Sequence, residues 1–328
     1  EGRHLWAMVY LLQRYFGRDG REEAEALLQR RSGDEDKPRI LGAFNEKTPD
    51  WVSFFMFTTF TDRDGKMQLE SLAQSGFDPL ARTCRFMLTE EGHHMFVGRT
   101  GVERIVQKTC EVMNEHGITD PDDIEGVRKY GAVDLPTIQK KINFHISVTL
   151  DLFGAEISTN AANSFNAGLK GRFRENRIDD DHQLEKDTYP VAQVVGDELQ
   201  VIEVPALSAI NTRLSDDYIA DCENVLKRWN RVLEEQNIER RLTLPHRAFH
   251  RAVGEFSQVK ATPEGQLITE SEWSRRHGEW LPSEADLEYM LSLMKPTFEP
   301  GEFSSWIAPP KAGINGQPGD YEYVKLAA

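Results

Sequence analysis

Apolar side chains recur at three- and four-residue intervals through the first half of the chain, which is the spacing of amphipathic helices. The pattern predicts helices over residues 1–16 and 21–31, separated by a break at 17–20. A long helix is predicted over 48–75, because Pro49 suits a first helical turn.

A glycine and a proline mark where the next helix begins. Gly76 ends the long helix, and Asp78-Pro79 supplies a cap and a first-turn residue. We expect this helix to reach about Gly98 and a separate helix to cover 101–116. After an acidic loop, one continuous helix is predicted over 135–169.

The pattern changes in the second half of the chain. Alternating apolar positions over 191–195 and 199–204 flank Gly196-Asp197 and predict a β-hairpin. A further long helix is expected over 207–236, and short helices separated by glycine and proline turns follow it. The second half therefore mixes strands with helices.

Composition narrows the classes of function. The 328 residues are 39% hydrophobic and carry a net charge of −15, which allows a sizeable core and disfavours a nucleic-acid partner. No apolar run reaches the roughly 18 residues of a membrane span, and no signal peptide is apparent. The three cysteines form no metal-binding or disulfide pattern. We expect a cytoplasmic protein with no membrane and no nucleic-acid partner.

Glu-x-x-His pairs are the candidate chemistry. Residues three apart share a helix face, so a glutamate and a histidine at this spacing can bind one metal ion or a pair. About one such pair is expected by chance. Three occur here: Glu1/His4, Glu90/His93 and Glu91/His94. The count alone leaves ordinary surface or core histidines as the alternative.

Asp62 is expected to lie at the same distance from the turn at residues 76–78 as Glu91, on the neighbouring helix. It lies 14 residues before Gly76, and Glu91 lies 13 residues after Asp78. Two antiparallel helices joined there place both side chains about 20 Å from the turn. A carboxylate on one helix and Glu-x-x-His on the next form half of a di-iron bundle. The alternative is a solvated charge cluster at a helix end.

Only one of the two overlapping pairs can face Asp62, because their side chains point about 100° apart on the helix. Di-iron oxygenases often read acid-Glu-x-Arg-His, in which the acid and the arginine are hydrogen-bonding partners of the ligands. Glu1-Gly2-Arg3-His4 matches the last four positions, and Glu90-Glu91-Gly92-His93-His94 matches with histidine in place of arginine. This match assigns Glu91 and His94 as ligands.

Three neighbouring residues are then expected to hold the ligands in place rather than bind metal: Arg3, Glu90 and His93. A metal-bound histidine normally donates its other ring N–H to an acceptor, and Glu90 is the candidate acceptor for His4.

Five metal ligands are therefore expected: Glu1, His4, Asp62, Glu91 and His94. A centre of this type takes four carboxylates and two histidines, so the missing carboxylate should lie about 30 residues upstream, and the chain is expected to be N-terminally truncated. Mixed nitrogen and oxygen ligands suit two non-haem iron ions and O₂. By contrast, His145 and Glu156, on one face of the predicted 135–169 helix, are expected to be core groups, and Asp179-x-x-His182 a polar loop.

The expected fold class is mainly α. We expect a ferritin-like di-iron helical bundle, without its first helix, over residues 1–175. Residues 176–328 are expected to form an irregular α+β extension with a hairpin, a long helix and an irregular tail.

Four phenylalanines close to Asp62 predict a dry pocket for a planar substrate, with core packing as the alternative: Phe54, Phe55, Phe57 and Phe60. Besides Glu91, Thr58 is a catalytic candidate, because it lies one turn before Asp62 and could deliver a proton. The chain has no glycine-rich dinucleotide loop and no iron–sulfur spacing. We therefore expect no bound flavin or nicotinamide, and electrons from a separate protein.

Several longer stretches resemble one family, the oxygenase components of benzoyl-CoA 2,3-epoxidases. They include residues 30–34, 44–51, 76–98, Phe60-Thr61-Asp62-Arg63-Asp64-Gly65-Lys66 and Trp306-Ile307-Ala308-Pro309-Pro310. The resemblance covers nearly the whole chain and implies that the five ligands hold two iron ions. It also implies that benzoyl-CoA, O₂ and electrons from a separate flavin/iron–sulfur NADPH reductase give 2,3-epoxybenzoyl-CoA.

Two alternatives stay open. One is a di-iron oxygenase for another aryl- or acyl-CoA, such as phenylacetyl-CoA, which substrate profiling would separate. The other is a non-catalytic metal-binding helical bundle, which would show no turnover of any thioester.

A coenzyme A substrate needs an anion site roughly 15–20 Å from the metals. The predicted helix start at Thr48, with Asn45 and Lys47 beside it, lies about 20 Å from them and favours phosphate. Lys170 and Arg172 are the competing basic pair. For both groups of residues, the alternative is that the side chains are ordinary solvent-exposed surface residues with no ligand.

Overall fold

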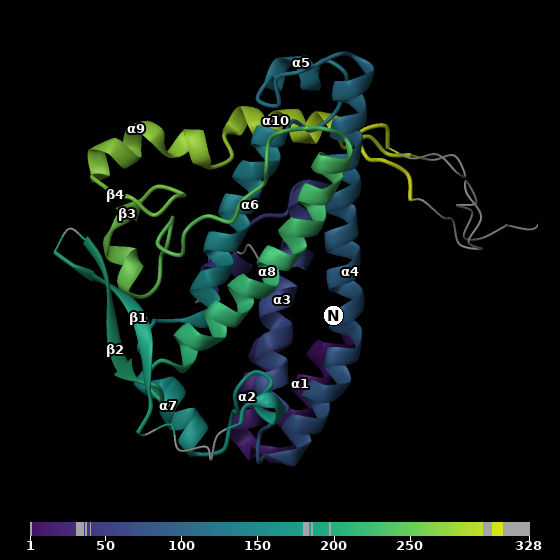
Figure 1. The fold of residues 1–328 in the computed structure, drawn as a ribbon. Coiled ribbons are helices and arrows are strands. Elements are labelled where there is room, and N and C mark those ends of the chain that lie inside the picture. The colour runs from purple at the N-terminus through teal and green to yellow at the C-terminus, as the bar shows by residue number, and fades with distance from the viewer. Residues whose placement is uncertain are drawn as a thin grey trace, which may run out of the picture.

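The computed structural model describes residues 2–30, 36, 38–39, 41–179, 184, 186–196, 198–297 and 304–310. Two long antiparallel helices run through the molecule, α3 (Trp51–Leu72) and α4 (Asp78–Glu115) (Figure 1). Asp50 caps α3 by accepting the backbone N–H of Ser53, and a proline lies in the first turn of α4.

Helix α4 is continuous where two helices were predicted, so the expected break near Gly98 is wrong. Gly98 and Gly101 lie inside α4 at positions that pack tightly against α3. A Cβ built on Gly98 would lie 2.4 Å from the hydroxyl oxygen of Thr58, and one on Gly101 would lie 2.5 Å from the ring of Phe55. The glycines serve the packing of two helices instead of ending one.

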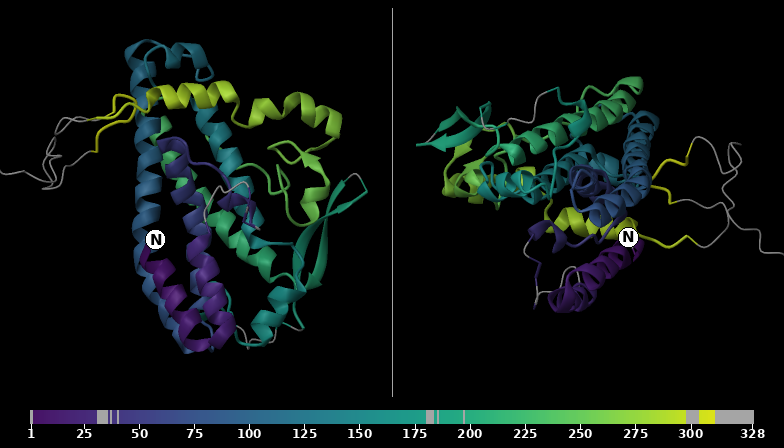
Figure 2. Two further views of the ribbon diagram at one scale, coloured as in Figure 1. Left: turned by 180° about the vertical axis from the view of Figure 1, so that it is seen from behind. Right: turned by 90° about the horizontal axis from the view of Figure 1, so that it is seen from below.

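Helices α1 (Gly2–Tyr15) and α2 (Gly17–Gln29) form a layer of their own against α3 and α4, which Figure 2 shows from behind and from below. The predicted gap at 17–20 is wrong, since α2 resumes at Gly17, whose φ of 61° makes the bend. Tyr15 packs edge-on against Phe77 at the start of α4, with ring centroids 5.4 Å apart. His4 lies beside Glu91 further along α4, so the two helices are antiparallel.

Helices α6 (Leu135–Leu150) and α8 (Ile210–Glu235) pack on the other side of α3 and α4 (Figure 1). One hydrophobic cluster joins all four helices. Phe60 of α3 lies edge-on to Trp229 of α8, with centroids 6.0 Å apart, and both side chains are fully buried. Helix α8 belongs to the second predicted domain, but it packs in the same core as the helices of the first. The predicted domain boundary at residue 175 stays a prediction.

The continuous helix predicted over 135–169 is wrong. Helix α6 ends at Leu150, a 3₁₀ turn η2 (Asp151–Phe153) follows, and Gly154 has a φ of 82° before α7 (Thr159–Asn166). Asp151 accepts the backbone N–H groups of residues 252 and 253 and pairs with Arg251 at 2.7 Å. These partners from the C-terminal part stabilise a turn that local sequence cannot reveal.

The remaining elements are short and lie mostly in the C-terminal part. Strands β1 (Thr188–Val195) and β2 (Glu198–Pro205) form the predicted hairpin, in which Val195 pairs with Glu198. The others are η1 (Gly42–Phe44), α5 (Ile124–Arg128), η3 (Glu175–Arg177), η4 (Glu255–Gln258), β3 (Lys260–Ala261), β4 (Leu267–Ile268), α9 (Glu270–Trp280) and α10 (Glu284–Leu293).

The predicted fold class, a mainly α bundle with an α+β extension, is confirmed. Among the described residues, none of the helices combines the length and apolar character that a membrane crossing requires.

His145 is a core group, as predicted, and it makes folding sensitive to pH. It is 3% exposed on α6. Burial, and then the charge of Lys141, lowers its pKa to about 3. The folded chain keeps His145 neutral, whereas the unfolded chain protonates it below about pH 6.5. Stability contributed by the neutral ring is therefore present above that pH and is lost as the pH falls toward 3.

We expect the free energy of unfolding to drop by about 1 kcal/mol per pH unit between pH 6 and pH 4 on account of this residue. Urea unfolding of the wild type and of His145→Met, followed by circular dichroism at several pH values, measures this. A variant with the same pH slope as the wild type would contradict the assignment.

Candidate metal centre

Helices α3 and α4 bring three of the predicted ligands together. One ligand atom from each of Asp62, Glu91 and His94 lies within 4.8 Å of the others. Nδ1 of His94 lies 3.4 Å from Oε2 of Glu91 and 3.7 Å from Oδ2 of Asp62. The antiparallel α3–α4 pair therefore places Asp62 level with the second Glu-x-x-His motif, as the residue spacing predicted.

Helix α1 adds His4 on the other side of Glu91. Nδ1 of His4 lies 3.6 Å from Oε1 of Glu91, and the rings of His4 and His94 are 6.4 Å apart. The two oxygens of one buried carboxylate thus face two different histidines. Glu1, the remaining predicted ligand, lies outside the described residues.

Two charged side chains beside His4, those of Glu90 and Arg3, form successive contacts that lead away from the candidate ligands. Oε2 of Glu90 lies 3.0 Å from Nε2 of His4, and Arg3 forms an ion pair with Glu90. This is the type of acceptor contact that a metal-bound histidine makes through its second ring nitrogen. His93 is exposed on α4, about 100° around the helix from His94. The structure therefore gathers Glu91 and His94 into the cluster and leaves the alternative pair outside it.

The donor set fits transition-metal ions. Asp62 and Glu91 offer carboxylate oxygens, and His4 and His94 offer imidazole nitrogens, all on side chains less than a quarter exposed. Carboxylates gathered in a poorly solvated place favour a bound cation, and mixed oxygen and nitrogen donors suit non-haem iron. These side chains could hold metal through oxygen and nitrogen donors.

Of the predicted catalytic and pocket residues, Thr58 lies on the same helix face as Asp62, whereas Phe60 lies in the hydrophobic core. Thr58 lies one turn before Asp62 on the same face, 7% exposed, and its hydroxyl donates to the carbonyl of Phe54 at 3.1 Å. Phe60 is fully buried against α8, so its predicted place in a substrate pocket is wrong. Position 60 lies about 160° around the helix from position 62, and this angle could have excluded it from sequence alone.

Phe57 is half-buried on α3. Phe54 and Phe55 pack with each other, with ring centroids 5.7 Å apart, and Phe54 is 38% exposed. These three rings therefore stay candidates for the pocket wall.

The predicted phosphate site at the start of α3 differs in detail from expectation. The helix begins at Trp51, three residues later than Thr48, and the Asp50 carboxylate already accepts a first-turn N–H. The side-chain amide of Asn45 both donates to and accepts from the backbone of Arg39, at 2.8 Å each. Lys47 and Thr48 are exposed in the connecting loop. The negatively charged carboxylate of Asp50 therefore lies at the helix start where a phosphate group of coenzyme A was predicted to bind.

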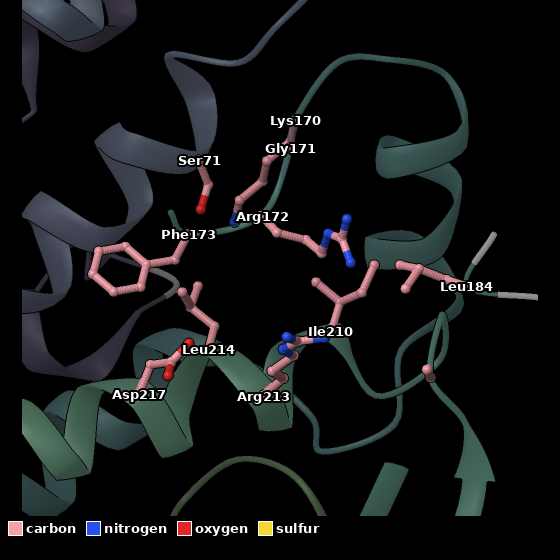
Figure 3. A pocket seen from close by; sticks show the side chains of 11 residues that line it. Ser71, Lys170, Gly171, Arg172, Phe173, Leu184, Ile210, Arg213, Leu214 and Asp217 are labelled. Atoms are coloured by element: carbon pink, nitrogen blue, oxygen red, sulfur yellow. The ribbon is translucent and has the colours of Figure 1, made fainter. Parts of the chain in front are cut away.

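Lys170 and Arg172 line a small hollow between the end of α3 and the start of α8 (Figure 3). Lys170 donates to Oε1 of Gln68 at 2.5 Å, and Arg172 pairs with Glu175 at 2.6 Å. Arg213 of α8 also lines the hollow, and nothing in the local sequence marked it.

The hollow faces away from the candidate metal ligands. Ser71, in its wall, lies nine residues after Asp62, which is half a turn around α3 and about 13.5 Å along it. A substrate bound there would have to pass around α3 to reach the candidate ligands.

No protein-family model matches the chain. The chain is 60% identical over 326 residues to the benzoyl-CoA oxygenase component B of Aromatoleum evansii, which covers 99% of this chain and 68% of that protein.

Proposed function

Because the chain belongs to the benzoyl-CoA oxygenase component B family, we propose that it forms the part of an oxygenase that epoxidises the ring of benzoyl-CoA at a di-iron centre. The observation that carries this proposal is the place of Glu91, whose two carboxylate oxygens face Nδ1 of His4 and Nδ1 of His94. A carboxylate whose two oxygens face different candidate ligands could be shared by two metal ions.

The proposed metal ligands divide between two sides of Glu91. His94 and Asp62 would hold one iron ion, His4 would hold the other, and Glu91 would be shared. Glu1, by its position in the first Glu-x-x-His motif, is proposed as a further ligand. When bound, the two irons supply the redox chemistry that activates O₂ and delivers one oxygen atom to the ring.

The surrounding side chains have distinct proposed roles. Oε2 of Glu90 lies 3.0 Å from Nε2 of His4, where it would accept the ring N–H and direct Nδ1 at the metal, and Arg3 would hold Glu90 in place. Thr58 carries a hydroxyl one turn from Asp62 and can pass a proton from Oγ1 when its bond to the Phe54 carbonyl is released. Phe54 and Phe55 keep water away from the substrate ring.

The overall reaction needs two electrons from a partner. Benzoyl-CoA, O₂, NADPH and a proton give 2,3-epoxybenzoyl-CoA, water and NADP⁺. We propose a separate flavin/iron–sulfur reductase as the source, supported by the relative's designation as one component of an oxygenase. The three cysteines of this chain are buried and far apart in sequence, which does not suit an iron–sulfur cluster.

The experiment that tests this function uses the full-length protein with its reductase. We expect two irons per chain, and O₂ consumption that requires both the reductase and benzoyl-CoA, with epoxide formed in equal amount. Faster turnover of phenylacetyl-CoA would support the alternative aryl-CoA oxygenase. Metal binding with no turnover of any thioester would support a non-catalytic bundle.

Lys47 and Lys170 offer competing sites for the coenzyme A phosphates. Lys47 lies on the same end of α3 as the exposed aromatic side chains, whereas Lys170 lies in the hollow on the far side of α3. Lys47→Glu is expected to weaken benzoyl-CoA binding by about 1 kcal/mol, or roughly fivefold in Kd, with iron content unchanged.

Isothermal calorimetry measures the Kd of each variant, with Lys227→Glu on the outer surface of α8 as the control. If Lys47→Glu binds normally and Lys170→Met binds weakly, the phosphates belong in the hollow.

A further inference from the structure

The ring of Phe55 lies directly on the backbone of α4 at Gly101. A Cβ built on Gly101 would lie 2.5 Å from both Cγ and Cδ1 of Phe55 and 2.7 Å from Cδ2. Real Cβ atoms essentially never approach so closely. Cγ is the ring atom nearest the backbone, so a small bend of the side chain cannot relieve the contact, and the whole ring would have to move. Glycine is therefore the residue that permits this position of Phe55.

Phe55 shares a face of α3 with the candidate ligand Asp62. It lies seven residues before Asp62, which is two turns, about 10.5 Å along the axis and about 20° around it. Thr58 lies between them on the same face. On α4, Gly101 follows Glu91 and His94 at 10 and 7 residues, again on one face. The Phe55–Gly101 contact is thus the next layer of α3–α4 packing beyond the candidate metal ligands.

The ring of Phe55 has buried neighbours on one side and exposed neighbours on the other. Val52 and Met56, its neighbours on the core side, are both fully buried. On the other side lie Trp51 and Phe54, which are 54% and 38% exposed and whose rings lie 5.8 and 5.7 Å from that of Phe55. A side chain at position 101 would push Phe55 toward this open aromatic side, above the candidate ligands.

We infer that Gly101 is a positioning residue. It fixes the ring of Phe55, and Phe55 sets the width of the apolar space in which the aromatic ring of the substrate lies. The inference rests on the proposed function, since it places benzoyl-CoA next to the Asp62–Glu91–His94 cluster. A planar aryl ring packs well against the flat face of a phenylalanine, and the amount of space beside such a face limits which substituents fit.

The test compares variants of the full-length, iron-loaded protein. Gly101→Ala is expected to raise the Kd of benzoyl-CoA, measured by calorimetry, and its KM, measured with the reductase, by about tenfold. Iron per chain should stay at the wild-type value. In the double variant Gly101→Ala/Phe55→Leu, the smaller leucine leaves room for the new Cβ at position 101. Its Kd and KM for benzoyl-CoA are expected to return to within about twofold of the wild-type values.

Two further variants separate positioning from general damage. Phe55→Leu alone should raise kcat/KM for 4-methylbenzoyl-CoA relative to benzoyl-CoA, whereas Gly101→Ala should lower the same ratio. Gly278→Ala makes the same change inside helix α9, where a Cβ meets nothing within 4 Å, and is the control with unchanged constants.

The inference is overturned if Gly101→Ala binds benzoyl-CoA normally, or if Phe55→Leu fails to restore binding in the double variant. A wild-type protein that binds benzoyl-CoA without oxidising it ends the proposed reaction, but the Kd values still decide the role of Gly101. A wild-type protein that does not bind benzoyl-CoA overturns both proposals.

Discussion

Replacing Glu91 by alanine in the full-length protein is expected to remove most of the bound iron and to abolish epoxidation. Glu91 is 6% exposed, and its two oxygens face His4 and His94 separately, so its loss affects both proposed metal positions. Loss of an outer partner of a ligand already costs about 10- to 100-fold in affinity or activity. A greater loss is expected for a carboxylate that two ions share.

Iron analysis and reductase-driven O₂ consumption measure this effect, with circular dichroism as a check of folding. Glu90→Gln is expected to cost about 10- to 100-fold while keeping part of the iron, because it changes only the acceptor of His4. Glu115→Ala removes an exposed glutamate from the end of the same helix and should change nothing. Full iron content and activity in Glu91→Ala would remove the proposed centre.

Replacing Asp50 by alanine is expected to destabilise the chain by about 3–5 kcal/mol, because it leaves the charge of Lys141 buried without its partner. Nζ of Lys141 donates to Oδ2 of Asp50 at 2.8 Å, and their side chains are 6% and 0% exposed. Burial alone would raise the pKa of Asp50, but the charge and hydrogen bond of Lys141, together with bonds from Ser53, hold it below its usual value. The same carboxylate caps the helix that carries Asp62.

Urea unfolding of Asp50→Ala, Lys141→Met and the double variant measures this pair. The double variant should lose less stability than the sum of the two single changes, because no unpaired buried charge remains. Additive losses, or a loss below about 1 kcal/mol for Asp50→Ala, would show that the pair matters little to the folded chain.

The local pattern of the sequence identified the helices that carry the candidate centre. The i, i+3 spacing places Glu91 and His94 on one face, and equal distances from the turn place Asp62 opposite them; the structure has both features. These relations depend only on helix geometry and on one tight turn. They could therefore be read without knowledge of the packing.

Several features needed contacts between residues far apart in sequence. Helix α6 ends at Leu150 because Asp151 pairs with Arg251, a hundred residues later. Helix α4 continues through Gly98 and Gly101 because α3 packs against them. Glycine has a low helix propensity, and only the neighbouring helix makes up for it.

By itself, the sequence determined the mainly helical fold class, the two Glu-x-x-His motifs and the level at which Asp62 meets the second of them. The tertiary structure decided that His4 of α1 joins the cluster from the other side of Glu91, that His93 is exposed, and that Phe60 belongs to the core. The physical reason is that a helical repeat fixes which residues share a face. Which face meets which neighbour depends on the packing of side chains from distant segments.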